Sequence, residues 1–256
     1  MLAESLAIAL DPVRLARRTL IEPDPWQAQL LRSRARQSLL LCCRQAGKSL
    51  TSALIAVDEA IHRPPALVLL LAPALRQSQE LYRRVRSTLT SAAHLAPPIV
   101  AESALRLELA SGSRIIALPG SKEATIRGYS NVALLVVDEA SRVSDTLYQS
   151  IRPMLAISGG RLVLLSTPFG KRGFFHHEYT EGGPGWERVK ITAPEVPRID
   201  PRWLAEERNR IGDWWFRQEY LCEFVETDDQ VFGYDEVMRA VSSDVPPLFP
   251  SARVAA

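Results

Sequence analysis

Cysteine and long hydrophobic runs are scarce in this chain of 256 residues, and each scarcity excludes a class of protein. Its three cysteines, Cys42, Cys43 and Cys222, are too few for a disulfide framework and show no spacing typical of zinc, which favours a reducing compartment. No apolar run approaches the roughly 18 residues that cross a bilayer, so we predict no membrane-spanning segment. A signal peptide is not expected, because no basic residue precedes the first apolar stretch and Glu4 interrupts it.

Lysine is also rare, and arginine takes its place. Of the 31 basic residues four are lysines, which leaves 27 arginines. The planar guanidinium suits forked contacts with phosphates, although a GC-rich genome or a warm habitat explains the bias about as well. The net charge of +2 excludes a bulk polycation but allows a local basic face. With 46% hydrophobic and 23% charged residues, the composition is that of a globular protein.

Four short apolar runs, rich in leucine or branched residues, alternate along the chain with helical patterns. Continuous runs of this kind are typical of strands buried on both faces, which occur in parallel sheets. Strands that alternate with helices indicate an α/β layered fold. We therefore predict an α/β fold with a mostly parallel central sheet flanked by helices. The runs occupy residues 37–43, 66–72, 133–137 and 161–166.

Amphipathic helices are predicted between the strands, because apolar residues recur there at helical spacing. The pattern covers residues 50–61, 75–89 and 147–155, and Pro153 is expected to kink or break the third helix. A β-hairpin is expected over residues 105–118, where two apolar runs flank a Ser-Gly turn.

The sequence pattern changes after about residue 195. An Asp-Pro pair at residues 200–201 predicts the start of a helix through residue 211, and an aromatic-rich helical stretch follows at 213–221. We interpret these two helices as a small lid. The predicted division is a core over residues 1–194, a lid subdomain over 195–242, and a linker or tail over 243–256.

The strongest functional motif is CCRQAGKS at residues 42–49, which lies between a predicted strand and a predicted helix. Backbone N–H groups at the helix start would bind a β-phosphate. Lys48 would neutralise the β- and γ-phosphates, and the Ser49 hydroxyl would hold Mg²⁺. Cys42 stands where such loops usually have a glycine that eases the turn. The predicted ATP-binding residues of this loop are Arg44, Gln45, Ala46, Gly47, Lys48 and Ser49.

A second motif, at residues 133–140, is a buried strand that ends in two carboxylates. Asp138 is placed to hold Mg²⁺ through water, and Glu139 can polarise the attacking water as the catalytic carboxylate. Such pairs belong at the ligand crevice of an open α/β sheet. The alternative, an acidic pair favoured by a helix dipole, is weakened by the phosphate loop about 90 residues upstream. Together the two motifs predict hydrolysis of a nucleoside triphosphate.

Two weaker motifs extend this prediction. The amide of Gln27, which follows Asp24, Pro25 and Trp26, can both donate to and accept from an adenine edge, although a helix start with a buried tryptophan explains the segment equally well. Thr167 ends the strand predicted at residues 161–166, where a hydroxyl could sense the γ-phosphate and couple hydrolysis to motion. An ordinary turn favoured by proline is the competing explanation.

Two arginines compete for the role of arginine finger. Arg127, next to Gly128 in a loop eleven residues before Asp138, suits stabilisation of charge on the transferring phosphoryl group. A solvated loop arginine is the alternative interpretation. Arg44, inside the phosphate loop, is the rival finger and would act within its own site.

Other clusters receive ordinary interpretations. Two sets of arginines are predicted to lie on solvated helix faces, with DNA phosphates as the less favoured contact. His176 and His177 are interpreted as packing or surface residues, and an aromatic trio as lid core rather than a base-stacking platform. The arginine sets are Arg76, Arg83, Arg84 and Arg86, and Arg32, Arg34 and Arg36; the trio is Trp214, Trp215 and Phe216.

The ordered motifs resemble the ATPase domain of the large terminase subunit of tailed bacteriophages. The resemblance covers residues 24–225. The Arg-Gln pair within the phosphate loop favours terminases over helicases in general. The matching segments are Pro25-Trp26-Gln27, residues 43–49, Arg127-Gly128, residues 137–141, Ser166-Thr167-Pro168, Gly170, Gly173-Phe174-Phe175 and residues 216–224.

The resemblance implies an additional-strand, catalytic-glutamate P-loop ATPase that threads double-stranded viral DNA into a procapsid. It implies ATP and Mg²⁺ as cofactors, a homo-oligomeric ring (usually taken as a pentamer), and a portal protein and small terminase subunit as partners. In such a ring Arg127 would act in trans. The implied location is the host cytoplasm, transiently docked on the portal, outside the mature virion. Family members continue into an RNase H-like nuclease, so the tail is interpreted as a linker toward it, and nuclease activity is not expected here.

Two alternatives were weighed against a packaging motor. A superfamily 2 helicase or translocase would need a second RecA-like domain, for which no comparable α/β pattern remains after residue 195. A nucleotide-binding scaffold that assembles without turnover is disfavoured by the presence of both Asp138 and Glu139.

Overall fold

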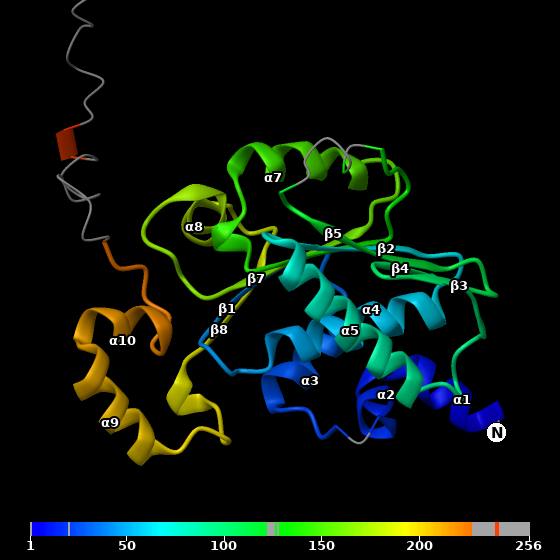
Figure 1. Cartoon of the computed structure of the whole chain (residues 1–256), viewed down its shortest axis with the longest axis horizontal. Coiled ribbons are helices and arrows are strands. Elements are labelled where there is room, and N and C mark those ends of the chain that lie inside the picture. The colour runs from blue at the N-terminus through cyan, green and yellow to red at the C-terminus, as the bar shows by residue number, and fades with distance from the viewer. Residues whose placement is uncertain (1, 20, 122–125, 127, 227–238, 241–256) are drawn as a thin grey trace, which may run out of the picture.

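An eight-stranded sheet forms the centre of the computed structural model, which describes residues 2–19, 21–121, 126, 128–226 and 239–240 (Figure 1). The strand order is β3-β4-β5-β2-β6-β7-β1-β8. From β5 to β8 all neighbours run parallel, whereas β3, β4 and β5 pair antiparallel. The strands are β1 (Gln37–Cys42), β2 (Leu67–Ala72), β3 (Ile99–Ser103), β4 (Arg106–Leu109), β5 (Arg114–Pro119), β6 (Leu134–Asp138), β7 (Arg161–Ser166) and β8 (Glu187–Ile191).

Helices cover both faces of this sheet. Figure 1 shows α3, α4 and α5 on one side, with α1 and α2 beyond them, and α7 and α8 on the other side. Helices α9 and α10 pack together at the side of the molecule near β8. The helices are α1 (Leu2–Leu10), α2 (Pro12–Arg18), α3 (Pro25–Arg32), α4 (Lys48–His62), α5 (Leu75–Ser91), α7 (Asp145–Ile151), α8 (Gly173–Thr180), α9 (Pro201–Ile211) and α10 (Asp213–Glu219).

The apolar runs of the sequence form the middle of the sheet, as predicted. Strands β1, β2, β6 and β7 are buried almost throughout, so helices on both faces keep water from their side chains. Strand β7 lies between β1 and β6. The phosphate-loop strand and the acidic strand are therefore separated by one additional strand, which confirms the predicted class of P-loop NTPase fold.

The structure adds two strands that the sequence patterns do not reveal. Strands β3 and β8 lie at the two edges of the sheet. Most of β3 is exposed and only the last residue of β8 is fully buried, so neither has the continuous apolar run that marks an interior strand. The predicted hairpin is present as β4 and β5.

Proline divides the helix that the pattern predicts over residues 147–155. Helix α7 ends at Ile151, and a 3₁₀ turn, Arg152–Leu155, contains Pro153. The ring removes the backbone donor that a continuing α-helix needs, so the expected break is confirmed. Helices α9 and α10 form where the lid is predicted, while residues 243–256 lie outside the described residues. The domain division itself stays a prediction.

None of the helices in the described ranges is both long enough and apolar enough to cross a membrane.

Gly160, immediately before β7, has no room for a side chain. A β-carbon there would lie 2.1 Å from the carbonyl oxygen of Val132 and 2.9 Å from that of Ala133. We expect Gly160→Ala to lower the free energy of unfolding by about 2 kcal/mol, because the backbone beside it must shift. Thermal unfolding of this variant and of Gly185→Ala, where nothing lies within 4 Å, tests the expectation. Equal midpoints for the two variants would contradict it.

Candidate nucleotide site

The loop between β1 and α4 turns at residues other than Cys42. Gln45 and Gly47 have φ angles of +61° and +94°, in the left-handed region. Cys42 is instead the last residue of β1 and pairs with Ile191 of β8. Position 42 therefore does not need glycine's conformational freedom, and the cysteine found there does not disturb the loop. Burial raises the pKa of the Cys42 thiol to about 12 and that of Cys43 to about 11, so both stay uncharged.

Gly47 is required at its position for two reasons. Its φ is left-handed, and a β-carbon would lie 2.7 Å from Nε2 of Gln27. Gln27 is buried, accepts a hydrogen bond from the backbone N–H of Asp24 (2.8 Å) and donates to Oγ1 of Thr51 (3.0 Å). The amide thus joins the start of α3 to α4 and presses on the phosphate loop. A contact between Gln27 and adenine stays a prediction.

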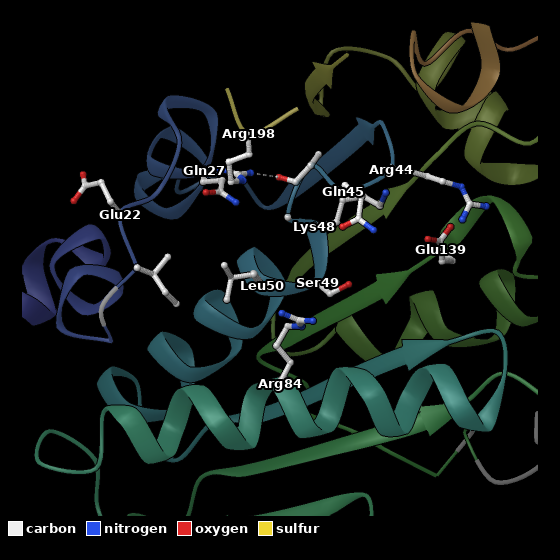
Figure 2. Close-up of a pocket in the computed structure, with 13 residues that line it drawn as sticks. Glu22, Gln27, Arg44, Gln45, Lys48, Ser49, Leu50, Arg84, Glu139 and Arg198 are labelled. Carbon is white, nitrogen blue, oxygen red and sulfur yellow. Dashed lines mark hydrogen bonds between the residues drawn. The ribbon is translucent and has the colours of Figure 1, made fainter. Parts of the chain in front are cut away.

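Lys48 is folded back into the loop that precedes it. Its Nζ donates to the carbonyl oxygens of Cys43 (3.1 Å) and Cys42 (3.4 Å), and the side chain is buried (Figure 2). These neutral acceptors do not neutralise the charge. The loop therefore holds a buried cation at the N-terminus of α4, where the helix dipole adds to the positive potential. This arrangement favours a phosphate ligand.

Ser49 and Asp138 come together from residues 89 apart in sequence. The Ser49 hydroxyl donates to Oδ2 of Asp138 over 3.3 Å. Burial, and then the charge of Glu139, raises the pKa of Asp138 to about 6. A hydroxyl and a carboxylate at this distance are a suitable oxygen pair for Mg²⁺, whose remaining ligands are usually water and nucleotide phosphates.

Glu139 adopts a backbone conformation that is unusual for a residue with a side chain. Its φ and ψ are +50° and +43°. The backbone N–H donates to Oδ1 of Asp138 (3.0 Å), and the Ser166 hydroxyl donates to Oε2 (3.4 Å). Ser166 is in turn 2.7 Å from the hydroxyl of Ser141. Strained residues of this kind cluster at functional sites, because the surrounding structure has to hold them.

A cavity of about 530 Å³ joins these groups, at the carboxyl ends of the parallel strands (Figure 2). It brings together Lys48, Ser49 and Glu139, with Asp138 bonded to Ser49 beneath them. Its lining residues are Ile21, Glu22, Gln27, Arg44, Gln45, Ala46, Gly47, Lys48, Ser49, Leu50, Arg84, Glu139 and Arg198.

Two predicted site residues are not in this lining. Thr167 is buried and its carbonyl accepts a hydrogen bond from Ser141 (2.9 Å), so it lies near the acidic strand without bordering the cavity. Its coupling role stays a prediction. Arg127 lies outside the described residues, so its role as a finger is not tested by the structure.

Arg44 contacts the lid. Its Nε is 2.5 Å from Oε2 of Glu219 on α10, and its backbone N–H donates to the Glu219 carbonyl (3.2 Å). The pKa of Arg44 is raised chiefly by the hydrogen bond to Glu219, and the charge of Glu139 adds to it. The arginine thus lies within the field of both a lid carboxylate and the proposed catalytic one.

Two further arginines border the cavity that sequence reasoning did not assign to it. Arg198, between β8 and α9, pairs with Asp24 (2.6 Å) and donates to the carbonyl of Ala46 (3.3 Å). No motif surrounds it, so only the tertiary fold could reveal it. Arg84 of α5 lines the cavity rather than facing solvent only, which corrects the interpretation of its helix face.

The aromatic and histidine predictions are confirmed except at Trp215. His176 is buried and meets Phe224 edge-on, while His177 is exposed beside Glu181. Phe216 is buried in the lid, as expected. Trp215 is 48% exposed and is therefore not part of the lid core.

Arg44 and Glu219 are expected to act as one unit in turnover. Arg44→Ala and Glu219→Gln should each lower kcat by roughly tenfold, and the double variant should lose no more than the worse single variant. Steady-state kinetics of the four proteins measure this coupling. Glu223→Gln is the matched control, because Glu223 pairs with the exposed Arg217 on the same lid. Additive losses would show that the contact has no role in turnover.

Comparison with known proteins agrees with this geometry. Residues 39–239 match the family described as "Terminase large subunit, T4likevirus-type, N-terminal". The large terminase subunit of Thermus virus P23-45 is 26% identical over 245 residues, which cover 83% of this chain and 50% of that protein. The chain thus spans about half the length of this relative.

Two solved structures share the fold. The large terminase ATPase domain of Thermus phage P74-26 has a TM-score of 0.74 and 23% identity, over 83% of this chain and 98% of that one. The large terminase of another thermophilic bacteriophage, solved in complex with ATP-gamma-S, has a TM-score of 0.59 and 13% identity, over 87% and 52%. With a family match that covers most of its length, the chain belongs to the large terminase subunit family, in the part that corresponds to the N-terminal domain.

Proposed function

We propose that this chain hydrolyses ATP and that hydrolysis drives double-stranded viral DNA into a procapsid. The observation that carries the proposal is the convergence of Lys48, Ser49 and the Asp138–Glu139 pair on one cavity. A cation at a helix start, an oxygen pair suited to Mg²⁺ and a second carboxylate are what triphosphate cleavage requires.

Each residue has a distinct part in this chemistry. The backbone N–H groups at the start of α4 would bind the β-phosphate, and Lys48 would leave the loop carbonyls for the β- and γ-phosphates. Ser49 and Asp138 would hold Mg²⁺, which neutralises charge on the phosphates. Glu139, held by Ser166, would orient and polarise the attacking water.

Several observations support ATP as the nucleotide and a motor as the context. The large terminase of a thermophilic bacteriophage that shares this fold was solved with ATP-gamma-S, and the family is that of large terminase subunits. The contact between Arg44 and Glu219 offers a physical link from the phosphate loop to the lid, so a change at the γ-phosphate could move α10. Motion requires that the nucleotide states differ in affinity for the two lid positions.

The proposed partners follow the family. They are double-stranded DNA, further copies of this chain in a ring, the portal protein and the small terminase subunit, met in the host cytoplasm while the ring is docked on the procapsid. Membership of this family favours packaging over the helicase alternative.

Phosphate release from ATP by the purified chain tests the proposal directly. We expect hydrolysis that needs Mg²⁺ and that rises per molecule with protein concentration, because ring assembly would complete each site. The absence of hydrolysis at every concentration, in a protein that unfolds cooperatively, would contradict the proposed activity.

A mixing experiment tests Arg127 as a finger supplied by a neighbour. Arg127→Ala and Lys48→Ala proteins should each be nearly inactive, because one lacks the finger and the other the phosphate-binding lysine. An equal mixture should recover up to about a quarter of wild-type ATPase, because about one interface in four pairs an intact pocket with an intact finger. No recovery in demonstrated mixed rings would favour a finger within the same subunit, such as Arg44.

A further inference from the structure

Arg84 occupies a place in the cavity that its position on α5 does not explain. It is exposed on that helix, yet Figure 2 shows its side chain leaving α5 toward Ser49 and Leu50, across the cavity from Gln27 and Arg198. Ser49 and Leu50 belong to the first turn of α4, which follows the phosphate loop. Arg84 therefore faces the start of the helix that would bind the phosphates.

The neighbours of Arg84 on the same helix are paired. Arg83 pairs with Glu80, and Arg86 pairs with Glu102 (2.7 Å). Within the described ranges the Arg84 guanidinium has no hydrogen bond or ion pair. In that part of the chain a carboxylate partner is thus available to the arginines that face outward but not to the one that faces the cavity.

The charges around Arg84 are mostly of its own sign. The cavity also holds Lys48, Arg44 and Arg198, and the N-terminus of α4 adds a partial positive charge. Arg44 and Arg198 are neutralised by Glu219 and Asp24, whereas Lys48 contacts only neutral carbonyls among the described residues. Two cations that face one space without a counter-ion stabilise a ligand with several negative charges.

The geometry points to Arg84 as a further phosphate-binding residue of the nucleotide site. It would contact the phosphate chain from the α5 side, opposite the loop of residues 42–49. A guanidinium suits this role, because it donates two parallel hydrogen bonds to phosphate oxygens. The inference rests on the proposed ATP site and adds a residue that no motif marks.

Nucleotide titration of three variants tests the inference. Calorimetry with ADP and with a non-hydrolysable ATP analogue, both with Mg²⁺, should show about tenfold weaker binding by Arg84→Ala, as expected for one charge-assisted contact at an open site. Arg84→Lys should recover part of the loss, because it keeps the charge. Arg83→Ala is the matched control and should bind like the wild type. Because Arg84 is exposed, all three variants should unfold at the wild-type temperature.

Three outcomes would overturn the inference. Equal nucleotide affinity of Arg84→Ala and Arg83→Ala would remove Arg84 from the site while leaving the proposed function intact. Unchanged nucleotide affinity with a selective loss of binding to a short DNA duplex would assign Arg84 to DNA instead. Nucleotide affinity that is insensitive even to Lys48→Ala would reject the ATP site itself, and with it the inference.

Discussion

Glu139→Gln is expected to abolish ATP turnover while leaving ATP binding almost unchanged. The substitution keeps the size of the side chain and its hydrogen bond from Ser166, but it removes the charge that would polarise the attacking water. General-base contributions are typically 10²–10⁴-fold, so we expect kcat to fall by about a thousandfold. Phosphate release and equilibrium binding of ATP measure the two effects separately.

Glu22→Gln is the matched control for this prediction. Glu22 borders the same cavity, but its carboxylate pairs with Arg17 and is largely exposed. Its removal should leave kcat within about twofold of the wild type. If Glu139→Gln and Glu22→Gln hydrolysed ATP at similar rates, Glu139 would lose the catalytic role.

Lys48→Ala is expected to weaken binding itself. Hydrogen bonds to a charged partner contribute about 1.5–3 kcal/mol, so the loss of Lys48 should raise the Kd for ATP by about 10- to 100-fold. Turnover should fall further, because the lysine also stabilises charge on the transferring phosphoryl group. Calorimetry with Mg²⁺ and ATP, together with steady-state kinetics, distinguishes the two losses.

An exposed lysine outside the cavity provides the comparison for Lys48. Lys190 lies on the edge strand β8, so Lys190→Ala removes the same charge from the chain without touching the loop. Tight ATP binding by Lys48→Ala, comparable with that of Lys190→Ala, would contradict the placement of the phosphates at residues 42–49.

The parts of this site that the sequence reveals are those encoded by consecutive residues. The phosphate loop and the acidic strand each fit within eight residues, and strand-helix context alone places both at the carboxyl edge of a parallel sheet. The structure confirms this convergence through the hydrogen bond between Ser49 and Asp138. The apolar runs likewise predict the interior strands, because burial on both faces leaves no polar alternation.

The parts that the sequence does not reveal depend on distant residues. Arg84 has the periodicity of an ordinary amphipathic helix, and only the packing of α5 on α4 turns it toward the cavity. Arg198 and Glu219 reach the loop from the segments around the lid, 152 and 175 residues away from their partners Ala46 and Arg44. The tight turn at Gln45 and Gly47 similarly explains Cys42 only once the backbone is seen.

A structure of the Glu139→Gln variant with Mg²⁺ and ATP would probe the account most directly. We predict the triphosphate along residues 44–49, with Nζ of Lys48 on the β- and γ-phosphates and the metal beside Ser49 and Asp138. A nucleotide bound elsewhere, or one bound here with its phosphates turned away from Lys48, would contradict the account.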